Sequence, residues 1–160
     1  MKRLWAPWRT AYVAGARAPS GCIFCTAPAA GDDRGQLVLQ RGRHGYLILN
    51  AYPYAAGHLL AVVYRHIASL AEATSEELTD LMTLVATATK TLTAEYRAEG
   101  FNIGLNQGRV AGAGIADHLH MHVVPRWHGD ANFVAVVGET RVIPEALDVT
   151  YDRLKERLRD

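Results

Sequence analysis

Residues 118–124 read His118-Leu119-His120-Met121-His122-Val123-Val124, with three of the chain's seven histidines at every second position. Side chains alternate between the two faces of a β-strand, so all three imidazoles would share one face and the apolar residues between them the other. The bases of neighbouring imidazoles would lie roughly 6.5 to 7 Å apart. On a helix the same spacing would scatter the rings. The alternation predicts a strand from His118 to Val124.

A row of imidazoles on one strand face has three explanations. It is a polar, solvent-facing surface, a metal site, or a catalytic group in which one neutral imidazole attacks phosphorus while its neighbours handle charge and protons. Burying three imidazoles without a task would leave ring nitrogens without hydrogen-bond partners. The pattern therefore favours a functional site and leaves metal binding and catalysis open.

The segments around this strand predict an α+β fold. Apolar stretches indicate further strands at residues 36–40, 45–50, 58–64 and 101–106. A long helix is predicted between the last two of these, and a tail helix over residues 144–158. Strands in runs, interrupted by one long helix, favour an antiparallel sheet of about five strands over alternating βαβ units.

The long helix carries its own start and stop signals. Thr74 can cap its N-terminus, and Glu77, three residues later, completes a capping box. Apolar residues then recur at helical spacing as far as Tyr96. Gly100 is the expected end.

The composition is that of one folded domain, with 49% hydrophobic and 21% charged residues. A formal charge of +1 offers no broad surface for nucleic acid or anionic lipid. No apolar run is long enough to cross a bilayer, and Met1–Trp8 lacks the apolar segment of a secretory signal. We therefore expect a single cytoplasmic domain over residues 1–160, with an irregular arm at 1–35, a core at 36–126 and a tail at 127–160.

Two further motifs have more than one interpretation. Cys22 and Cys25 form a Cys-x-x-Cys pair, which is consistent with a redox pair or with half of a metal site. Gly108, Gly112 and Gly114 space a loop that precedes a strand, so it is neither a dinucleotide-binding fingerprint nor a P-loop. Such a loop is either a phosphate-binding nest of backbone amides or a flexible connection.

The chain resembles the histidine triad family. Residues 118–124 match the family signature of alternating histidines and apolar residues, and residues 50–63 are similar to its nucleoside-binding strand pair. Residues 4–9 and 124–127 resemble the bacterial branch of diadenosine tetraphosphate phosphorylases or hydrolases. The segment that leads into the phosphate loop is similar at Asn102, Asn106, Gln107 and Gly108.

The resemblance implies a two-step transfer through a covalent nucleotidyl-histidine. In the family the middle histidine is the nucleophile, which is His120 here. It must attack as a neutral imidazole, and a hydrogen bond from its other ring nitrogen would select the tautomer. His122 would contact the phosphate oxygens or the leaving group, as a charge stabiliser or proton donor.

The resemblance also implies a set of substrate-binding residues. Asn50 would hold ribose hydroxyls, His58 would help to orient the cluster, and Asn106 and Gln107 would contact phosphate or ribose. Gly114 falls in the expected phosphate loop, at a position where many family members carry glutamine, followed by serine or threonine. This chain has Gly-Ile instead, which puts the standard hydrolase chemistry in doubt.

Zinc-bearing histidine triad proteins resemble this chain in four further positions. They carry two cysteines in the arm, a histidine eight residues after the Gly-His position, and the first histidine of the triad. The corresponding residues are Cys22, Cys25, His66 and His118. These are the residue types of a closed structural zinc site. With His118 as a ligand, the proton donor would be His122 or water.

Together these features predict an enzyme that binds a dinucleoside polyphosphate. The expected reaction is phosphorolysis of diadenosine tetraphosphate to ADP and ATP, with inorganic phosphate as co-substrate and zinc as a structural cofactor. The alternatives are hydrolysis to AMP and ATP, hydrolysis of nucleoside phosphoramidates, and a zinc-stabilised nucleotide-binding module without turnover. A homodimer or larger homo-oligomer is expected.

Overall fold

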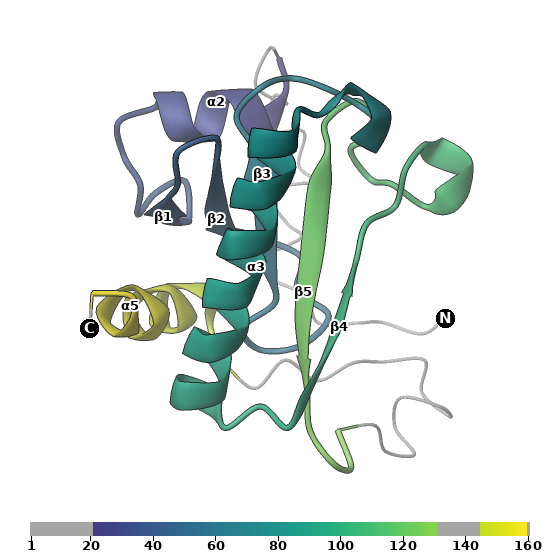
Figure 1. Cartoon of the computed structure of the whole chain (residues 1–160). Coiled ribbons are helices and arrows are strands. Elements are labelled where there is room, and N and C mark those ends of the chain that lie inside the picture. The colour runs from purple at the N-terminus through teal and green to yellow at the C-terminus, as the bar shows by residue number, and fades with distance from the viewer. Residues whose placement is uncertain (1–20, 131–144, 160) are drawn as a thin grey trace, which may run out of the picture.

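The computed structural model describes residues 21–130 and 145–159, which form an antiparallel sheet with helices against its faces (Figure 1). The five strands lie in the order β1-β2-β3-β5-β4, and every neighbouring pair is antiparallel. This confirms the predicted fold class. The strands are β1 (Val38–Arg41), β2 (Gly45–Leu49), β3 (Leu59–Val63), β4 (Gly100–Gly104) and β5 (His120–Arg126).

Three α-helices and two short 3₁₀ helices complete the described chain. None of these helices is long and apolar enough to span a membrane. The long helix α3 runs across one face of the sheet, and the C-terminal helix α5 lies beside it (Figure 1). The helices are α2 (Ile23–Ala29), η2 (Leu70–Glu72), α3 (Ser75–Tyr96), η3 (Arg109–Ala111) and α5 (Leu147–Arg157).

Both faces of the central strands are covered, because alternate residues of β2 and β3 enter two different cores. All ten residues of these two strands are buried. Towards α3 and α5 the strands contribute Leu47, Leu49, Leu59, Ala61 and Val63. Towards α2 they contribute Tyr46, Ile48, Leu60 and Val62. This double burial explains why both strands read as continuous apolar runs.

Helix α3 begins as the sequence predicts. Thr74 accepts a hydrogen bond from the backbone N–H of Glu77, and the Glu77 carboxylate accepts one from the N–H of Thr74. The Arg65 guanidinium also donates to both carboxylate oxygens of Glu77, at 2.9 and 2.8 Å. The helix ends at Tyr96, and its C-cap is Arg97 with φ 51°, not the expected Gly100, which instead opens β4.

The expectation of an irregular arm over residues 1–35 is wrong for residues 23–29, which form α2. Pro28 in the last turn made a helix there an unfavourable prediction, because proline has no N–H to donate to the carbonyl four residues earlier. That carbonyl belongs to Phe24, and it accepts a hydrogen bond of 2.7 Å from the Tyr46 hydroxyl of β2. A contact with the sheet thus replaces the missing helical bond. Residues 1–20 lie outside the described chain.

Several strand boundaries also differ from the prediction. The strand β5 starts at His120, two residues late, and continues through Pro125. Its pairing with β3 ends at Val123, so Pro125 has only β4 beside it and its missing N–H breaks no ladder between β5 and β3. The fourth strand ends at Gly104 rather than at residue 106. The tail helix begins at Leu147, and residues 131–144 lie outside the described part.

Gly57, which precedes the site residue His58, provides a test of this packing. Its φ is +75°, and a Cβ there would lie 2.7 Å from Leu92 Cδ2. We expect Gly57→Ala to destabilise the fold by roughly 1 to 3 kcal/mol, because both backbone strain and overpacking oppose it. Gly100→Ala, where nothing lies within 4 Å, is the control. Urea unfolding should show a lower midpoint for Gly57→Ala only, and equal midpoints would contradict this packing.

Glu77 should make the fold sensitive to acid. Its hydrogen bonds to Arg65 and Thr74 lower the pKa of the Glu77 carboxyl to about 2. Because this pKa lies below that of the unfolded chain, the stabilisation is present above about pH 4.5 and is lost as the pH falls towards 2. We expect Glu77→Gln to lower the free energy of unfolding at pH 7 by roughly 1 to 3 kcal/mol and to lose this part of the acid transition. Glu156→Gln, on the exposed surface of α5, is the control and should leave the pH profile unchanged.

Candidate active site

Four histidines gather on the sheet face opposite α3. His120 and His122 of β5 lie opposite Val62 and Leu60 of β3, which belong to the core on the α2 side. His118 lies two residues before β5, and His58 lies immediately before β3. His58, His118 and His120 are each at most 6% exposed. The alternating residues Leu119 and Val123 enter the core below α3. As the sequence predicts, the histidines therefore lie on one face of the strand and the apolar residues on the other.

The imidazole of His120 is held in one tautomer. Its Nδ1 lies 2.8 Å from the backbone carbonyl oxygen of His118. A carbonyl can only accept, so Nδ1 carries the proton and Nε2 keeps a free lone pair. Burial lowers the pKa of His120, although the hydrogen bond to His118 acts against that. The ring is therefore a neutral imidazole with its lone pair on Nε2, the form that the predicted nucleophile needs.

A second chain of hydrogen bonds fixes the proton of His122. The backbone N–H of Tyr54 donates to Nδ1 of His58, at 3.1 Å. A neutral His58 then carries its proton on Nε2 and donates it to Nδ1 of His122, at 2.9 Å. The proton of His122 consequently sits on Nε2. Burial, and secondarily the neighbouring His120, lower the pKa of His122 and keep it neutral.

Asn50 supports this chain from the turn before β3. Its side-chain oxygen accepts from the backbone N–H of Tyr52 at 2.9 Å, which orients the amide nitrogen towards His58, at 3.2 Å from Nδ1. In this structure Asn50 therefore holds His58, and through it His122. Its expected contact with ribose hydroxyls remains a prediction.

Tyr54 is a member of the cluster that sequence reasoning missed. Its ring centroid lies 4.6 Å from that of His58, and its ring is stacked on His122 with an interplanar angle of 11°. Half of Tyr54 remains exposed, so it covers the histidine pair from the solvent side. The signal was the Tyr-Pro-Tyr turn just before the Gly-His pair, where aromatic residues beside a proline are unusual for a purely solvated turn.

The remaining predicted substrate contacts lie between β4 and β5. Asn106, Gln107 and Gly114 are all exposed there. The Gln107 side chain accepts a hydrogen bond of 3.0 Å from the backbone N–H of Leu70, and so ties this loop to η2. Gly108 and Gly112 both have φ of +87°, a conformation that glycine adopts without strain. The structure thus places these residues on a loop apart from the histidine hydrogen bonds, and their contact with substrate remains a prediction.

A second cluster, which shares His118 with the histidine group, brings together the four predicted metal ligands. One ligand atom from each of Cys22, Cys25, His66 and His118 lies within 4.8 Å of all the others. Cys22 Sγ is 3.3 Å from Nδ1 of His118, and Cys25 Sγ is 3.3 Å from Nδ1 of His66. The two Nδ1 atoms are 3.2 Å apart. This cluster, which we call the Cys/His cluster, could hold a metal ion.

The surroundings of His118 fit that role. Its Nε2 lies 2.8 Å from the carbonyl oxygen of Val63, so Nε2 carries the proton and the Nδ1 lone pair points into the cluster. A hydrogen bond from the non-ligating nitrogen to a carbonyl is the usual support for a metal-bound histidine. Burial and the neighbouring Cys22 raise the pKa of the Cys25 thiol, a cost that a bound cation would offset by favouring thiolate.

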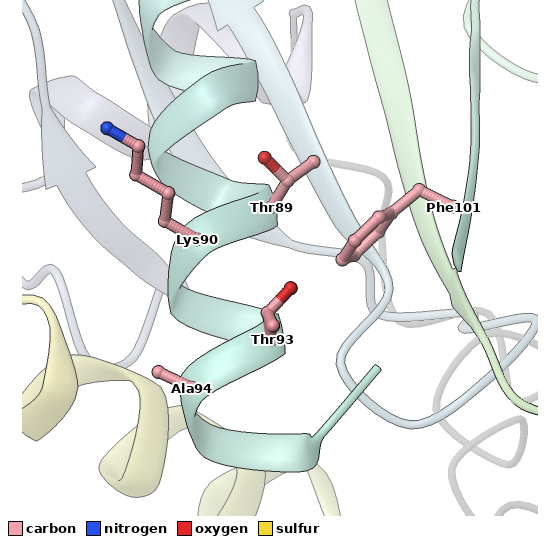
Figure 2. Close-up of a pocket in the computed structure, with 5 residues that line it drawn as sticks. All are labelled: Thr89, Lys90, Thr93, Ala94 and Phe101. Atoms are coloured by element: carbon pink, nitrogen blue, oxygen red, sulfur yellow. The ribbon is translucent and has the colours of Figure 1, made fainter. Parts of the chain in front are cut away.

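A shallow hollow lies on the other face of the sheet. It is formed by Phe101 of β4 and by residues on one side of α3, and Figure 2 shows the Phe101 ring directed towards Thr89 and Thr93. Phe101 packs against the core below α3, whereas the histidines face α2. The hollow is therefore not part of the histidine site.

This combination of fold and site defines a protein class. The model of the HIT domain family matches residues 34–129, and the chain belongs to the HIT family. It is 43% identical over 155 residues to a protein named AP-4-A phosphorylase from Mycobacterium tuberculosis, covering 92% of this chain and 79% of that one. It is 32% identical over 96 residues to the asymmetrical bis(5'-nucleosyl)-tetraphosphatase of Schizosaccharomyces pombe, covering 60% and 52%.

Solved structures confirm the fold. The crystal structure of a Zn-bound histidine triad family protein from Mycobacterium smegmatis matches with a TM-score of 0.70 and 23% identity, and covers 87% of this chain and 94% of that one. A hypothetical histidine triad nucleotide-binding protein from Sulfolobus tokodaii matches with a TM-score of 0.67 and 24% identity, with coverages of 86% and 92%.

Metal binding by the Cys/His cluster can be tested directly. Cobalt(II) bound by two thiolates should give a sulfur-to-cobalt charge-transfer absorption, at about one ion per chain. We expect replacement of Cys22 and Cys25 together by serine to abolish this absorption, because both thiolate ligands are lost. His128→Ala, which removes an exposed histidine outside the cluster, should leave it unchanged. Retention of the absorption in the double variant would contradict the ligand assignment.

Proposed function

We propose that this protein transfers the adenylyl group of diadenosine tetraphosphate to inorganic phosphate and so produces ADP and ATP. The observation that carries the proposal is the fixed tautomer of His120, whose Nε2 lone pair is available while Nδ1–H is held by the carbonyl of His118. The 43% identity to a protein named AP-4-A phosphorylase over nearly the whole chain supports the choice of substrate and acceptor.

In the first step Nε2 of His120 attacks the α-phosphorus, the bond to the bridging oxygen breaks, and ATP leaves. The hydrogen bond from Nδ1 to the His118 carbonyl keeps the ring's N–H proton in place while Nε2 bonds to phosphorus, so the adenylyl-imidazole is cationic. The carbonyl dipole stabilises that charge. His122 presents its Nε2–H, and in the proposed complex this group donates to an oxygen of the reacting phosphate.

In the second step inorganic phosphate attacks the same phosphorus and the P–N bond breaks. A cationic imidazole is a good leaving group, because it departs as the neutral ring from which the cycle began. The acceptor phosphate becomes the β-phosphate of ADP. Attack by water instead would give AMP, which is the hydrolytic alternative that the yeast tetraphosphatase relative represents.

The proposal assigns supporting roles to residues around the two reactive histidines. Asn50 and His58 orient His122, as their hydrogen bonds indicate, and Asn50 also contacts ribose. Asn106, Gln107 and Gly114 contact the phosphate chain or ribose from the loop before β5, by resemblance to the family. The Gly-Ile pair at residues 114 and 115 lacks the usual amide and hydroxyl, and this favours a bulkier acceptor than water.

We further propose zinc as the resident metal, since two thiolates and two imidazoles form a tetrahedral set that zinc prefers. Bound zinc would supply no reaction chemistry, but would join α2 to the segment after β3 and to the residues just before β5. The family resemblance also leads us to propose a cytoplasmic homodimer or larger homo-oligomer, which light scattering of the purified chain would test.

Product analysis decides the reaction. With diadenosine tetraphosphate and labelled phosphate, we expect the label in ADP, unlabelled ATP, and no turnover without phosphate. His120→Ala should lower kcat by at least about a thousandfold, because the covalent route is lost, while the exposed His128→Ala should keep it.

Other products would favour the alternatives. AMP and ATP formed regardless of phosphate would make the protein a hydrolase. No turnover of this substrate would favour either nucleoside phosphoramidates or a nucleotide-binding module. The second of these predicts that His120→Ala keeps its nucleotide affinity.

A further inference from the structure

Phe24 joins two parts of the molecule that the proposed function treats separately. It lies between Cys22 and Cys25 in the sequence, in the first turn of α2. Its side chain is buried, with 5% of the residue exposed, although its neighbour Ile23 in the same turn is 42% exposed. The turn that carries Cys22 and Cys25 therefore also places the Phe24 side chain in the core on the α2 side.

The ring of Phe24 lies against the nucleophile. Its centroid is 4.8 Å from that of His120 and 5.5 Å from that of His118. The His120 ring also contacts the ring of His122, with the two centroids 5.2 Å apart. The hydrogen bond from Nδ1 fixes one atom of the His120 imidazole but leaves the ring free to tilt about that bond. Contact with the rings of Phe24 and His122 restricts this tilt, and so helps to set where the Nε2 lone pair points.

Phe24 is itself anchored to the sheet. Its backbone carbonyl accepts the hydrogen bond from Tyr46, which is available because Pro28 donates nothing to it. Tyr46 is fully buried in the core on the α2 side, where Phe24 also packs. The position of Phe24 is thus fixed in two ways. A hydrogen bond to Tyr46 ties its backbone to the sheet, and the neighbouring residues Cys22 and Cys25 tie it to the Cys/His cluster.

We propose that Phe24 is a positioning residue for His120 and that it transmits the state of the Cys/His cluster to the nucleophile. This inference rests on the proposed function, in which Nε2 of His120 attacks phosphorus. Ligation of Cys22 and Cys25 fixes the turn that carries Phe24, and the ring fixes the imidazole. Attack on phosphorus requires close alignment, and a displacement of about 1 Å is sufficient to slow a reaction about a hundredfold. The contacts of Phe24 that bear on the reaction are with the ring of His120, so we infer that it acts through His120.

The first test compares Phe24→Leu with Ile23→Leu in the same turn. We expect Phe24→Leu to slow the single-turnover formation of adenylyl-histidine at least tenfold, while KM changes less than twofold and cobalt binding is retained. Ile23→Leu should change none of these. Loss of cobalt binding in proportion to the loss of rate would overturn the proposal, because the effect would then be structural.

A spectroscopic measurement follows the ring directly. The Cε1–H resonance of His120 in a ¹H–¹³C correlation spectrum should carry a ring-current shift from Phe24, which Phe24→Leu removes and Ile23→Leu keeps. Phe24→Met, which fills the same space with a flexible chain, is the second variant if leucine prevents folding. An unchanged His120 resonance in the folded variant would overturn the proposal.

Coupling to the Cys/His cluster is tested by combining the changes. Serine at both Cys22 and Cys25 should slow adenylyl transfer in the native background but cause less than a twofold further loss in Phe24→Leu, because both act through one contact. Independent, multiplicative losses would overturn the coupling. If the native protein forms no adenylyl-histidine, the proposed function fails. The shift of the His120 resonance on removal of diamagnetic zinc, large in the native chain and at least halved in Phe24→Leu, still decides whether Phe24 transmits the state of the cluster.

Discussion

The antiparallel pairing of β5 with β3 is the constraint on which the site depends. It sets His122 opposite Leu60 and His120 opposite Val62, and so fixes which face of the sheet the imidazoles share. A slip of one residue would move every histidine of β5 into the apolar core below α3 and every apolar residue out of it. Burial of Leu119 and Val123 under α3 makes that slip costly. Packing of the core on one face of the sheet therefore fixes the position of the histidines on the other face.

Backbone groups fix the protons of His120 and His58, and His58 in turn fixes that of His122. The carbonyl of His118 can only accept and the amide of Tyr54 can only donate, so the tautomers of His120 and His58 follow from the fold. The tautomer of His122 then follows from that of His58. Burial lowers the pKa of both His120 and His122. The result is one imidazole with a free lone pair beside another with a free N–H, both uncharged before the substrate enters.

Local patterns predicted the parts of this structure that local forces determine. The alternation in residues 118–124 gave the face of the strand, and the Thr74–Glu77 pair gave the start of α3. The four members of the Cys/His cluster came from family resemblance, since spacing alone does not join residues 22 and 118. Helix α2 was missed because Pro28 argues against a helix until Tyr46 supplies the missing hydrogen-bond donor. A hydrogen bond from a residue so distant in the sequence cannot be predicted from the residues next to Pro28.

His118 is the residue at which the two sites meet, because its side chain and its backbone do different work. Its Nδ1 points into the Cys/His cluster, whereas its carbonyl holds the proton of His120. A change in the cluster that moves the His118 backbone would therefore also change the hydrogen bond that fixes the tautomer of His120. Its Nε2–H is already donated to Val63, so the His118 ring has no proton to offer the leaving group. In the proposed mechanism the three histidines of residues 118–124 therefore have different roles. His118 holds the proton of His120, His120 attacks phosphorus, and His122 keeps an N–H for the phosphate.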